Sequence, residues 1–266
     1  MLNIKTKAPE EGLLSYIKEC YFFQKNTLEK KYIPVIDDCC YDFIFFEESN
    51  SILEYSTDKK QIKIEFKIFT IHNLQPPYKI KLNEKFTFFT IKVQPWMNSF
   101  FFSNIKKDGV FSLNEYDRFN IIELHRRIRK ESLIDKKFRV TESFFLELDL
   151  FLSKTSLLVK EICEFIYKKK GIVTVNELSK RYSMSRQYLN RVFKKEVLYS
   201  LKRFITTVRI LDLIKYKIKT TTISLTEISY KYNYFDQSHF IRDFKQVCGV
   251  KPKYFFENLP EFMLRH

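Results

Sequence analysis

Several polar side chains share the outward face of a helical segment near the end of the chain, between residues 228 and 245. These side chains are Gln237, Ser238, His239, Arg242 and Lys245. Glutamine and arginine can each form paired hydrogen bonds to base edges in the major groove of DNA. His239 has no neighbouring histidine or cysteine, so we do not expect it to bind a metal ion. The pattern therefore indicates a helix that reads base edges.

A second helical segment, between residues 185 and 196, carries a similar set of polar side chains. Leu189, Val192 and Phe193 have the spacing of a buried helical stripe. That spacing leaves the following residues outward: Arg186, Gln187, Asn190, Arg191 and Lys194. Taken alone, this face could be an ordinary solvated surface. Two such faces in one chain favour recognition of two successive major grooves.

Residues typical of helix N-termini indicate that each polar face lies on the second helix of a helix-turn-helix unit. In the first unit, Thr174 and Glu177 have the spacing of a capping box. Ser185 then follows a short turn and is a suitable N-cap for the helix that carries the polar face.

The second unit repeats this order further along the chain. A helix over residues 224–232 leads through a turn at 233–235 into a helix over 236–246, and a glycine and a proline follow. Residues 200–217 connect the two units and contain neither glycine nor proline, so they predict one stiff helix. A helix of that length spans roughly 27 Å, which is close to the length of one turn of B-DNA, about 34 Å.

Residues 234–245, together with 249–254, closely resemble the signature of the AraC/XylS family of bacterial transcription regulators. Residues 185–196 and the downstream Arg209 are similar to the first helix-turn-helix unit and the linker helix of that family. The resemblance covers residues 156–257.

Two positions depart from the family pattern. Asn233 stands where the family usually has a glycine, and asparagine tolerates the left-handed backbone that such a turn needs. Leu198 replaces the glycine that often follows the first reading helix.

The resemblance implies a role for each matching side chain, and it implies double-stranded DNA and RNA polymerase as partners. The residues that would face bases or nearby phosphates are Gln187, Asn190 and Arg191 in the first unit, and Gln237, Ser238, His239 and Arg242 in the second. Lys194 and Lys245 lie towards the C-termini of their helices, where contacts with phosphates tune affinity.

The first half of the chain has the alternating pattern of short strands separated by turn residues. It predicts a short amphipathic helix over 12–20, strands over 41–46, 61–69, 79–82 and 86–93, and helices over 120–128 and 142–153. This half resembles, more weakly, the regulatory domain that many AraC-type proteins carry before their DNA-binding part.

We therefore expect an α+β fold in two domains. Residues 1–155 would form a small cupin-like β-barrel (1–110) with flanking helices (111–155). Residues 156–266 would form an all-α DNA-binding domain with two helix-turn-helix units joined by a linker helix. By resemblance, the first domain would bind a small effector, pair two subunits into a homodimer, or do both. The phenylalanine-rich stretches at 100–102 and 144–152 could form a dimer seam or plain core, and core is favoured.

Basic residues are concentrated in the half of the chain that carries the motifs. The 266-residue chain has a formal net charge of +15, and residues 156–266 contain 22 Lys and Arg against 10 Asp and Glu. Such an excess is typical of a protein with a polyanionic partner. Five cysteines without CxxC spacing, and no secretory signal or apolar run of membrane-spanning length, indicate a cytoplasmic protein.

Sequence motifs of common enzyme classes are absent, and no enzyme activity or cofactor is expected. The sequence has no GxSxG, P-loop, GxGxxG or HExxH, and it contains only four glycines. One alternative is a small-molecule-binding β-barrel sensor whose basic helical half docks a protein or another polyanion. A less favoured alternative is an enzymatic barrel fused to a DNA-binding module. Sequence specificity that survives moderate salt would favour the DNA-binding regulator.

Overall fold

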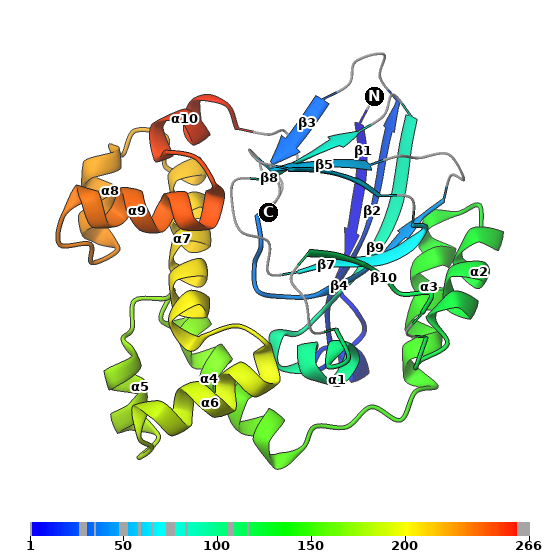
Figure 1. Ribbon diagram of the computed structural model, residues 1–266, viewed down its shortest axis with the longest axis horizontal. Helices are drawn as coiled ribbons and strands as arrows, with labels where there is room; N and C mark the ends of the chain where they lie inside the picture. Colours follow the sequence, from blue (N-terminus) through cyan, green and yellow to red (C-terminus); the bar gives the residue numbers. More distant parts are fainter. Residues whose placement is uncertain are drawn as a thin grey trace.

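The computed structural model describes residues 2–26, 31–34, 36–47, 53–57, 60–64, 66–72, 78–82, 85–105, 109–115 and 117–259. The strands lie in the first half of the chain and form two antiparallel sheets. The second half is helical and lies beside them (Figure 1). The expected α+β class, with a sheet-rich first part and a helical second part, is confirmed.

The larger sheet has six strands in the order β1-β2-β9-β4-β7-β10. Their bounds are β1 Leu2–Lys7, β2 Ile17–Asn26, β4 Asp42–Phe46, β7 Ile68–His72, β9 Lys85–Val93 and β10 Gly109–Ser112. Phe89, Ile91 and Val93 on one face of β9 are fully buried, and so is Thr90 on the other face, so both faces of this central strand are covered.

The smaller sheet has four strands in the order β3-β8-β5-β6. Their bounds are β3 Lys31–Pro34, β5 Leu53–Thr57, β6 Lys60–Ile64 and β8 Tyr78–Leu82. Among the described strands, no ladder of hydrogen bonds joins this sheet to the larger one. The word barrel therefore fits this half only loosely, because closure requires every strand to pair on both sides.

The expected helix over residues 12–20 is wrong. A single 3-10 turn, η1 (Glu11–Leu13), precedes β2, which already begins at Ile17. A shift in register between Ile17 and Glu19 interrupts the pairing of β2 with β9. Such a bulge lets Ile17 and Cys20, three residues apart, both be buried, so the spacing imitates a helix.

Two further expected elements have different bounds. The strand expected over 61–69 is divided between β6 and β7, which belong to different sheets. The helix expected over 142–153 is correct only to Leu146, where α3 (Ile134–Leu146) ends. Beyond it, Leu148, Leu150 and Leu152 are half-buried and alternate with exposed residues, so this segment is extended.

Helices pack against the central strands of the larger sheet, with Phe101 and Phe145 against Phe43 of β4 and Phe138 against Phe89 of β9. After β9 come η2 (Pro95–Met97) and α1 (Asn98–Phe102), and α2 (Ile121–Lys130) precedes α3. Of the phenylalanine-rich stretches, Phe101, Phe102, Phe144 and Phe145 are buried in the core, while Phe151 is 59% exposed. No helix in the described ranges is both long and apolar enough to cross a membrane.

The second half consists of helices separated by short turns. Their bounds are α4 Lys154–Lys168, α5 Val175–Arg181, α6 Arg186–Val197, α7 Leu201–Lys219, α8 Leu225–Lys231, α9 Gln237–Cys248 and α10 Pro252–Glu257. The expected division at 155/156 falls in the first turn of α4 and remains a proposal.

Two hydrophobic clusters are distributed unequally over these helices. One extends from the larger sheet through α4, α5 and α6 to Val208 on α7. The other begins at Ile210 on α7 and includes α8, α9 and α10. The first helix-turn-helix unit therefore shares a core with the N-terminal sheet, whereas the second has a core of its own.

Candidate nucleic-acid interface

The first helix-turn-helix unit consists of α5 and α6. Thr174 and Glu177 form the expected capping box: Glu177 N–H donates to Thr174 Oγ1 at 3.1 Å, and Thr174 N–H donates to the Glu177 carboxylate at 2.6 Å. Ser183 in the turn has φ 52°, and the hydroxyl of Ser185 accepts from Tyr188 N–H at 3.2 Å at the start of α6. The predicted start signals of this unit are confirmed.

The buried stripe and outward face of α6 lie as expected. Leu189, Val192 and Phe193 are 0 to 9% exposed. The side chains left in solvent are Arg186, Gln187, Arg191 and Lys194. Asn190 is half-buried, and its amide donates to the carbonyl of Arg186 at 2.9 Å. This hydrogen bond also stabilises the first turn of the helix.

The second unit, α8 and α9, is built in the same way. Ser224 and Glu227 form a second capping box, which the sequence analysis did not predict. Asn233 in the turn has φ 57°, which confirms that asparagine adopts the left-handed conformation there. The carboxylate of Asp236 accepts from His239 N–H at 2.7 Å at the start of α9. Gly249 (φ 77°) ends the helix.

The predicted residues of α9 are also on its surface. Gln237, Ser238, Arg242 and Lys245 are exposed. The amide of Gln237 donates to the hydroxyl of Thr226 on α8 at 2.6 Å, which holds the side chain against the first helix of its unit. The remaining predicted residue, His239, is half-buried, with Nε2 3.3 Å from the carboxylate of Asp243.

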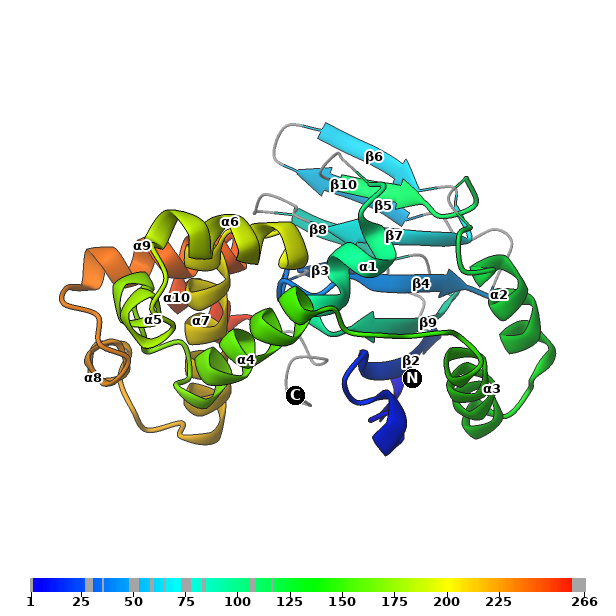
Figure 2. The same ribbon diagram turned by 90° about the horizontal axis from the view of Figure 1, so that it is seen from below.

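The linker helix α7 positions the two units. Its 19 residues span roughly 28 Å at 1.5 Å per residue. Figures 1 and 2 agree that α6 and α9 lie on the same side of α7. The two helices therefore lie on one side of the linker helix, as reading of two grooves on one face of a duplex requires.

Arg209, which the resemblance placed on the linker helix, connects the two units. Its Nε donates to the carbonyl of Gly171 at 2.8 Å, and its guanidinium lies 5.4 Å from the ring centroid of Tyr234 in the second unit. Gly171 has φ 69°, and a Cβ atom there would lie 2.4 Å from the backbone N of Arg209. The close approach of these two segments therefore requires glycine at this position.

The C-terminal end of α6 is held by the N-terminal part of the chain. Asn98, which is fully buried, donates to the carbonyl of Val197 at 2.8 Å and to the carbonyl of Cys39 at 3.0 Å. The carboxylate of Glu196 accepts from the hydroxyl of Ser99 at 3.3 Å. Leu198, next along the chain, has φ 65°, so the left-handed turn usually made by glycine is made here by leucine. Side chains from the first half of the chain, Asn98 and Ser99, therefore stabilise the C-terminal end of α6.

An acidic side chain of the first half reaches the start of α7. The carboxylate of Asp37 accepts from the hydroxyl of Tyr199 at 2.8 and 2.9 Å and lies 3.3 Å from Nη2 of Arg203. Burial raises the pKa of Asp37, and the positive charge of Arg203 acts against that rise. Sequence reasoning missed these contacts, because Asp37 and Tyr199 lie far apart in the chain.

Beside this contact lies a second buried charge cluster. Lys18 and Lys92 approach the carboxylate of Asp38 at 3.1 and 2.9 Å. Burial alone would raise the pKa of Asp38, but the two lysines bring it below its ordinary value. The neighbouring Asp42 has no such ion pair with a lysine among the described residues, and burial raises its pKa to about 7.

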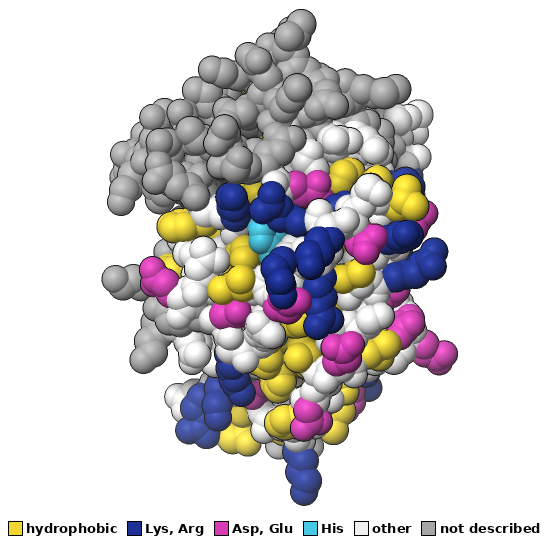
Figure 3. All heavy atoms as spheres, turned by 90° about the vertical axis from the view of Figure 1, so that its right-hand side faces the viewer, with side chains coloured by type: hydrophobic (Ala, Val, Ile, Leu, Met, Phe, Trp, Pro, Cys, Tyr) yellow, Lys and Arg dark blue, Asp and Glu magenta, His cyan; other side chains and the backbone are white. Residues whose placement is uncertain are grey.

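Lys and Arg side chains also gather on the face formed by α2 and α3 (Figure 3). Exposed cations of α2 are already paired: Arg127 lies 3.1 Å from the Glu123 carboxylate, and Nε of Arg126 donates to it at 2.7 Å. Among the described residues, the cations on the outward faces of α6 and α9 have no salt-bridge partner. Free cations of this kind are better suited to a polyanion than paired ones.

The five cysteines are free and buried, as the sequence predicts for reduced thiols. In the described part of the chain, no cluster of histidine, cysteine and acidic side chains is arranged to hold a metal ion.

The comparisons with known proteins agree with this geometry. A family model described as a helix-turn-helix domain matches residues 178–258. The Msm operon regulatory protein of Streptococcus mutans serotype c is 30% identical over 104 residues, which is 39% of this chain and 37% of that protein. The match therefore spans little more than a third of the length of that relative.

Solved structures similar to the whole chain include two crystal structures of ToxT from Vibrio cholerae. One, from strain O395, has a TM-score of 0.48 at 14% identity and covers 98% of each chain. The other, at 1.65 Å resolution, has a TM-score of 0.47 at 12% identity and covers 99% of each chain. The family model and the curated relative bear on the C-terminal region of the chain, which matches a helix-turn-helix domain.

Proposed function

We propose that this chain, whose C-terminal region matches a helix-turn-helix domain, is a sequence-specific transcription regulator of the AraC type that binds double-stranded DNA. The observation that carries the proposal is the placement of α6 and α9 on one side of α7 (Figures 1 and 2). Both helices carry exposed polar and basic side chains, and among the described residues their Lys and Arg side chains have no salt-bridge partner. The linker helix α7 is roughly 28 Å long, which is of the order of one turn of B-DNA, about 34 Å.

We assign base contacts to the residues near the start of each reading helix. Gln187 and Arg191 on α6, and Gln237 and Arg242 on α9, have side chains that can form paired bonds to base edges. Asn190, Ser238 and His239 lie beside them and supply further donors and acceptors. Arg186, Lys194 and Lys245 contact phosphates, which position the protein without reading sequence.

The N-terminal part regulates the first reading helix in this proposal. Asn98 and Ser99 bind the end of α6, and Asp37 binds the start of α7. A change in the larger sheet, caused by an effector or by pairing of two subunits, would be transmitted through these contacts to α6. The proposal also includes three further features: homodimer formation, a small-molecule effector, and RNA polymerase as a partner.

Selection of bound sites from a random pool of DNA duplexes tests the proposed function. The expected result is a consensus with two conserved segments and a preference for it over random DNA that persists at moderate salt. Equal affinity for all sequences, falling steeply with salt, would instead support the alternative of a basic half that docks any polyanion.

Substitution of the two arginines then tests the assignment of residues. Arg191→Ala and Arg242→Ala should each weaken binding to the selected site by about 10- to 100-fold, since a good bidentate pair contributes about 1–3 kcal/mol. Lys215→Ala, which removes an exposed cation of α7, is the matched control. Wild-type affinity in both arginine variants would contradict the assignment.

A further inference from the structure

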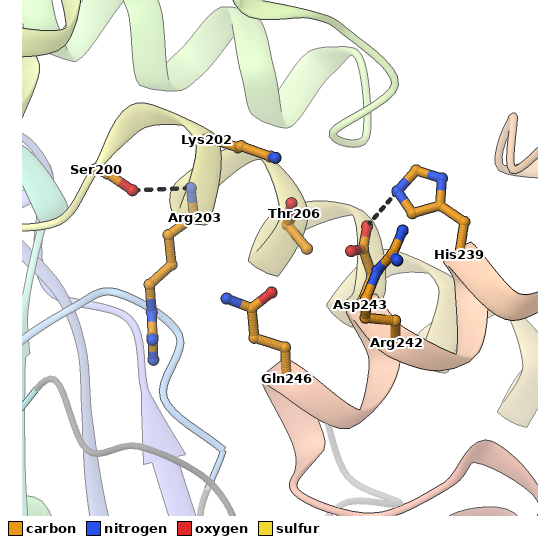
Figure 4. A pocket seen from close by; sticks show the side chains of 8 residues that line it. All are labelled: Ser200, Lys202, Arg203, Thr206, His239, Arg242, Asp243 and Gln246. Carbon is orange, nitrogen blue, oxygen red and sulfur yellow. Dashed lines mark hydrogen bonds and ion pairs between the residues drawn. The ribbon is translucent and has the colours of Figure 1, made fainter.

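A pocket of about 360 Å³ lies between the start of α7 and the middle of α9 (Figure 4). Its walls include Lys202, Arg203 and Thr206 from α7, and Arg242 and Gln246 from α9. Thr206 and Gln246 point toward one another across the pocket. The sequence analysis treated the start of α7 only as part of a connecting helix, so neither Lys202 nor the pocket was predicted.

Positive charge predominates among the side chains that line this pocket. Lys202, Arg203 and Arg242 are cationic, and Asp243 is the acid among the lining residues. The carboxylate of Asp243 is 3.3 Å from Nε2 of His239, and Arg203 lies beside Asp37. Lys202 and Arg242 are exposed, and neither has a salt-bridge partner among the described residues. These two cations are therefore available to an anion.

The neutral side chains of the pocket are suited to the same kind of ligand. Thr206 and Gln246 each offer a donor, a hydroxyl and a side-chain amide, from opposite helices. Two cations and two neutral donors around one space match the several acceptor oxygens of a phosphate group. A flat apolar ligand would leave these polar groups without partners.

We propose that this pocket binds a phosphate group. For a phosphate of the DNA backbone, the proposal rests on the proposed function: the backbone between the two grooves would pass beside the pocket, where Lys202 of α7 would contact it. The same chemistry would hold the phosphate of a free small molecule. In either case the phosphate would lie near Arg203, whose contact with Asp37 joins the pocket to the N-terminal part.

Lys202→Gln tests the pocket, because Lys202 lies outside both reading helices and is exposed. Lys215→Gln is the matched control: it removes the same charge from an exposed position of the same helix, outside the pocket. Circular dichroism and thermal unfolding establish that both variants are folded. Binding to the selected DNA site is then measured as a function of salt, and inorganic phosphate is titrated into the DNA-free protein by calorimetry.

A backbone phosphate in the pocket predicts that Lys202→Gln weakens DNA binding several-fold and reduces the salt slope by about 0.9, since one phosphate contact is lost. A free phosphate ligand predicts instead that inorganic phosphate binds the wild type and Lys215→Gln, but not Lys202→Gln. If Lys202→Gln and Lys215→Gln behave alike in both the DNA-binding and the phosphate measurements, the proposal is overturned, even if the wild type binds DNA. If the wild type binds no DNA, the proposed function fails, and the phosphate titration decides on the pocket alone.

Discussion

At the scale of single residues, two positions have an unusual local environment, one of the backbone and one of a buried charge. Gly171 is one, because it has a positive φ and lies directly against the backbone of Arg209. Asp42 is another, because one of its buried carboxylate oxygens has no hydrogen-bond partner among the described residues. Each position leads to a prediction that concerns one side chain.

Gly171→Ala should destabilise the protein by about 1–3 kcal/mol, because the added Cβ meets backbone atoms and the left-handed φ is strained for alanine. The free energy of unfolding in urea measures the effect. Gly12→Ala is the control, since its Cβ would be 3.6 Å from Leu146, an ordinary contact. Similar stability of the two variants would contradict the close approach of Gly171 to Arg209.

Asp42→Asn should change the pH dependence of stability. The folded pKa of Asp42, about 7, lies above the ordinary 3.8, so the protonated carboxyl stabilises the fold at low pH. That contribution is lost as the pH rises from about 4 through about 7. The stability of the Asn variant relative to wild type should therefore increase over this range, as measured by urea unfolding at a series of pH values. A constant difference, like that expected for Asp149→Asn at an exposed position, would contradict the shifted pKa.

At the scale of elements, the helix starts were the most predictable part of the molecule. Thr174, Ser185 and Asn233 act through the backbone of their own turn, so local sequence suffices to identify them. The strands were harder to assign, because the bulge in β2 and the division between β6 and β7 depend on partners elsewhere in the chain. The contacts of Asn98 with the end of α6 are equally non-local, and nothing near Asn98 in the sequence indicates them.

Ser224→Ala should lower the stability of the second unit by about 1 kcal/mol, because it removes the hydroxyl that accepts from Glu227 N–H and caps α8. Since α8 belongs to the second hydrophobic cluster, amide hydrogen exchange should accelerate in α8 and α9 and change little in the larger sheet. Exchange that accelerates equally in the sheet would show that the two clusters unfold together.

At the scale of the whole molecule, the N-terminal sheet and the first helix-turn-helix unit form one packed body, while the second unit has its own core. This arrangement could not be derived from the sequence, which indicated a domain boundary at residues 154–156, between two expected helices. The hydrophobic clusters divide within α7, and the expected domain boundary stays a proposal. A signal from the N-terminal part would therefore reach the first reading helix more directly than the second.

Tyr199→Phe tests that connection, because it removes only the hydroxyl that donates to Asp37. A hydrogen bond to a charged group contributes about 1.5–3 kcal/mol, so the free energy of unfolding should fall by that order. Hydrogen exchange should accelerate at the start of α7 and the end of α6. Tyr254→Phe, at a position 53% exposed, should have little effect. Equal effects of the two substitutions would argue against the contact.

Methylation interference on the selected DNA site tests most directly whether α6 and α9 read two successive major grooves. We expect two segments of interference on one face of the duplex, centred about 10 base pairs apart. Arg191→Ala should abolish interference in one segment and Arg242→Ala in the other. A single segment, or loss of both segments in each variant, would contradict reading by two separate helices.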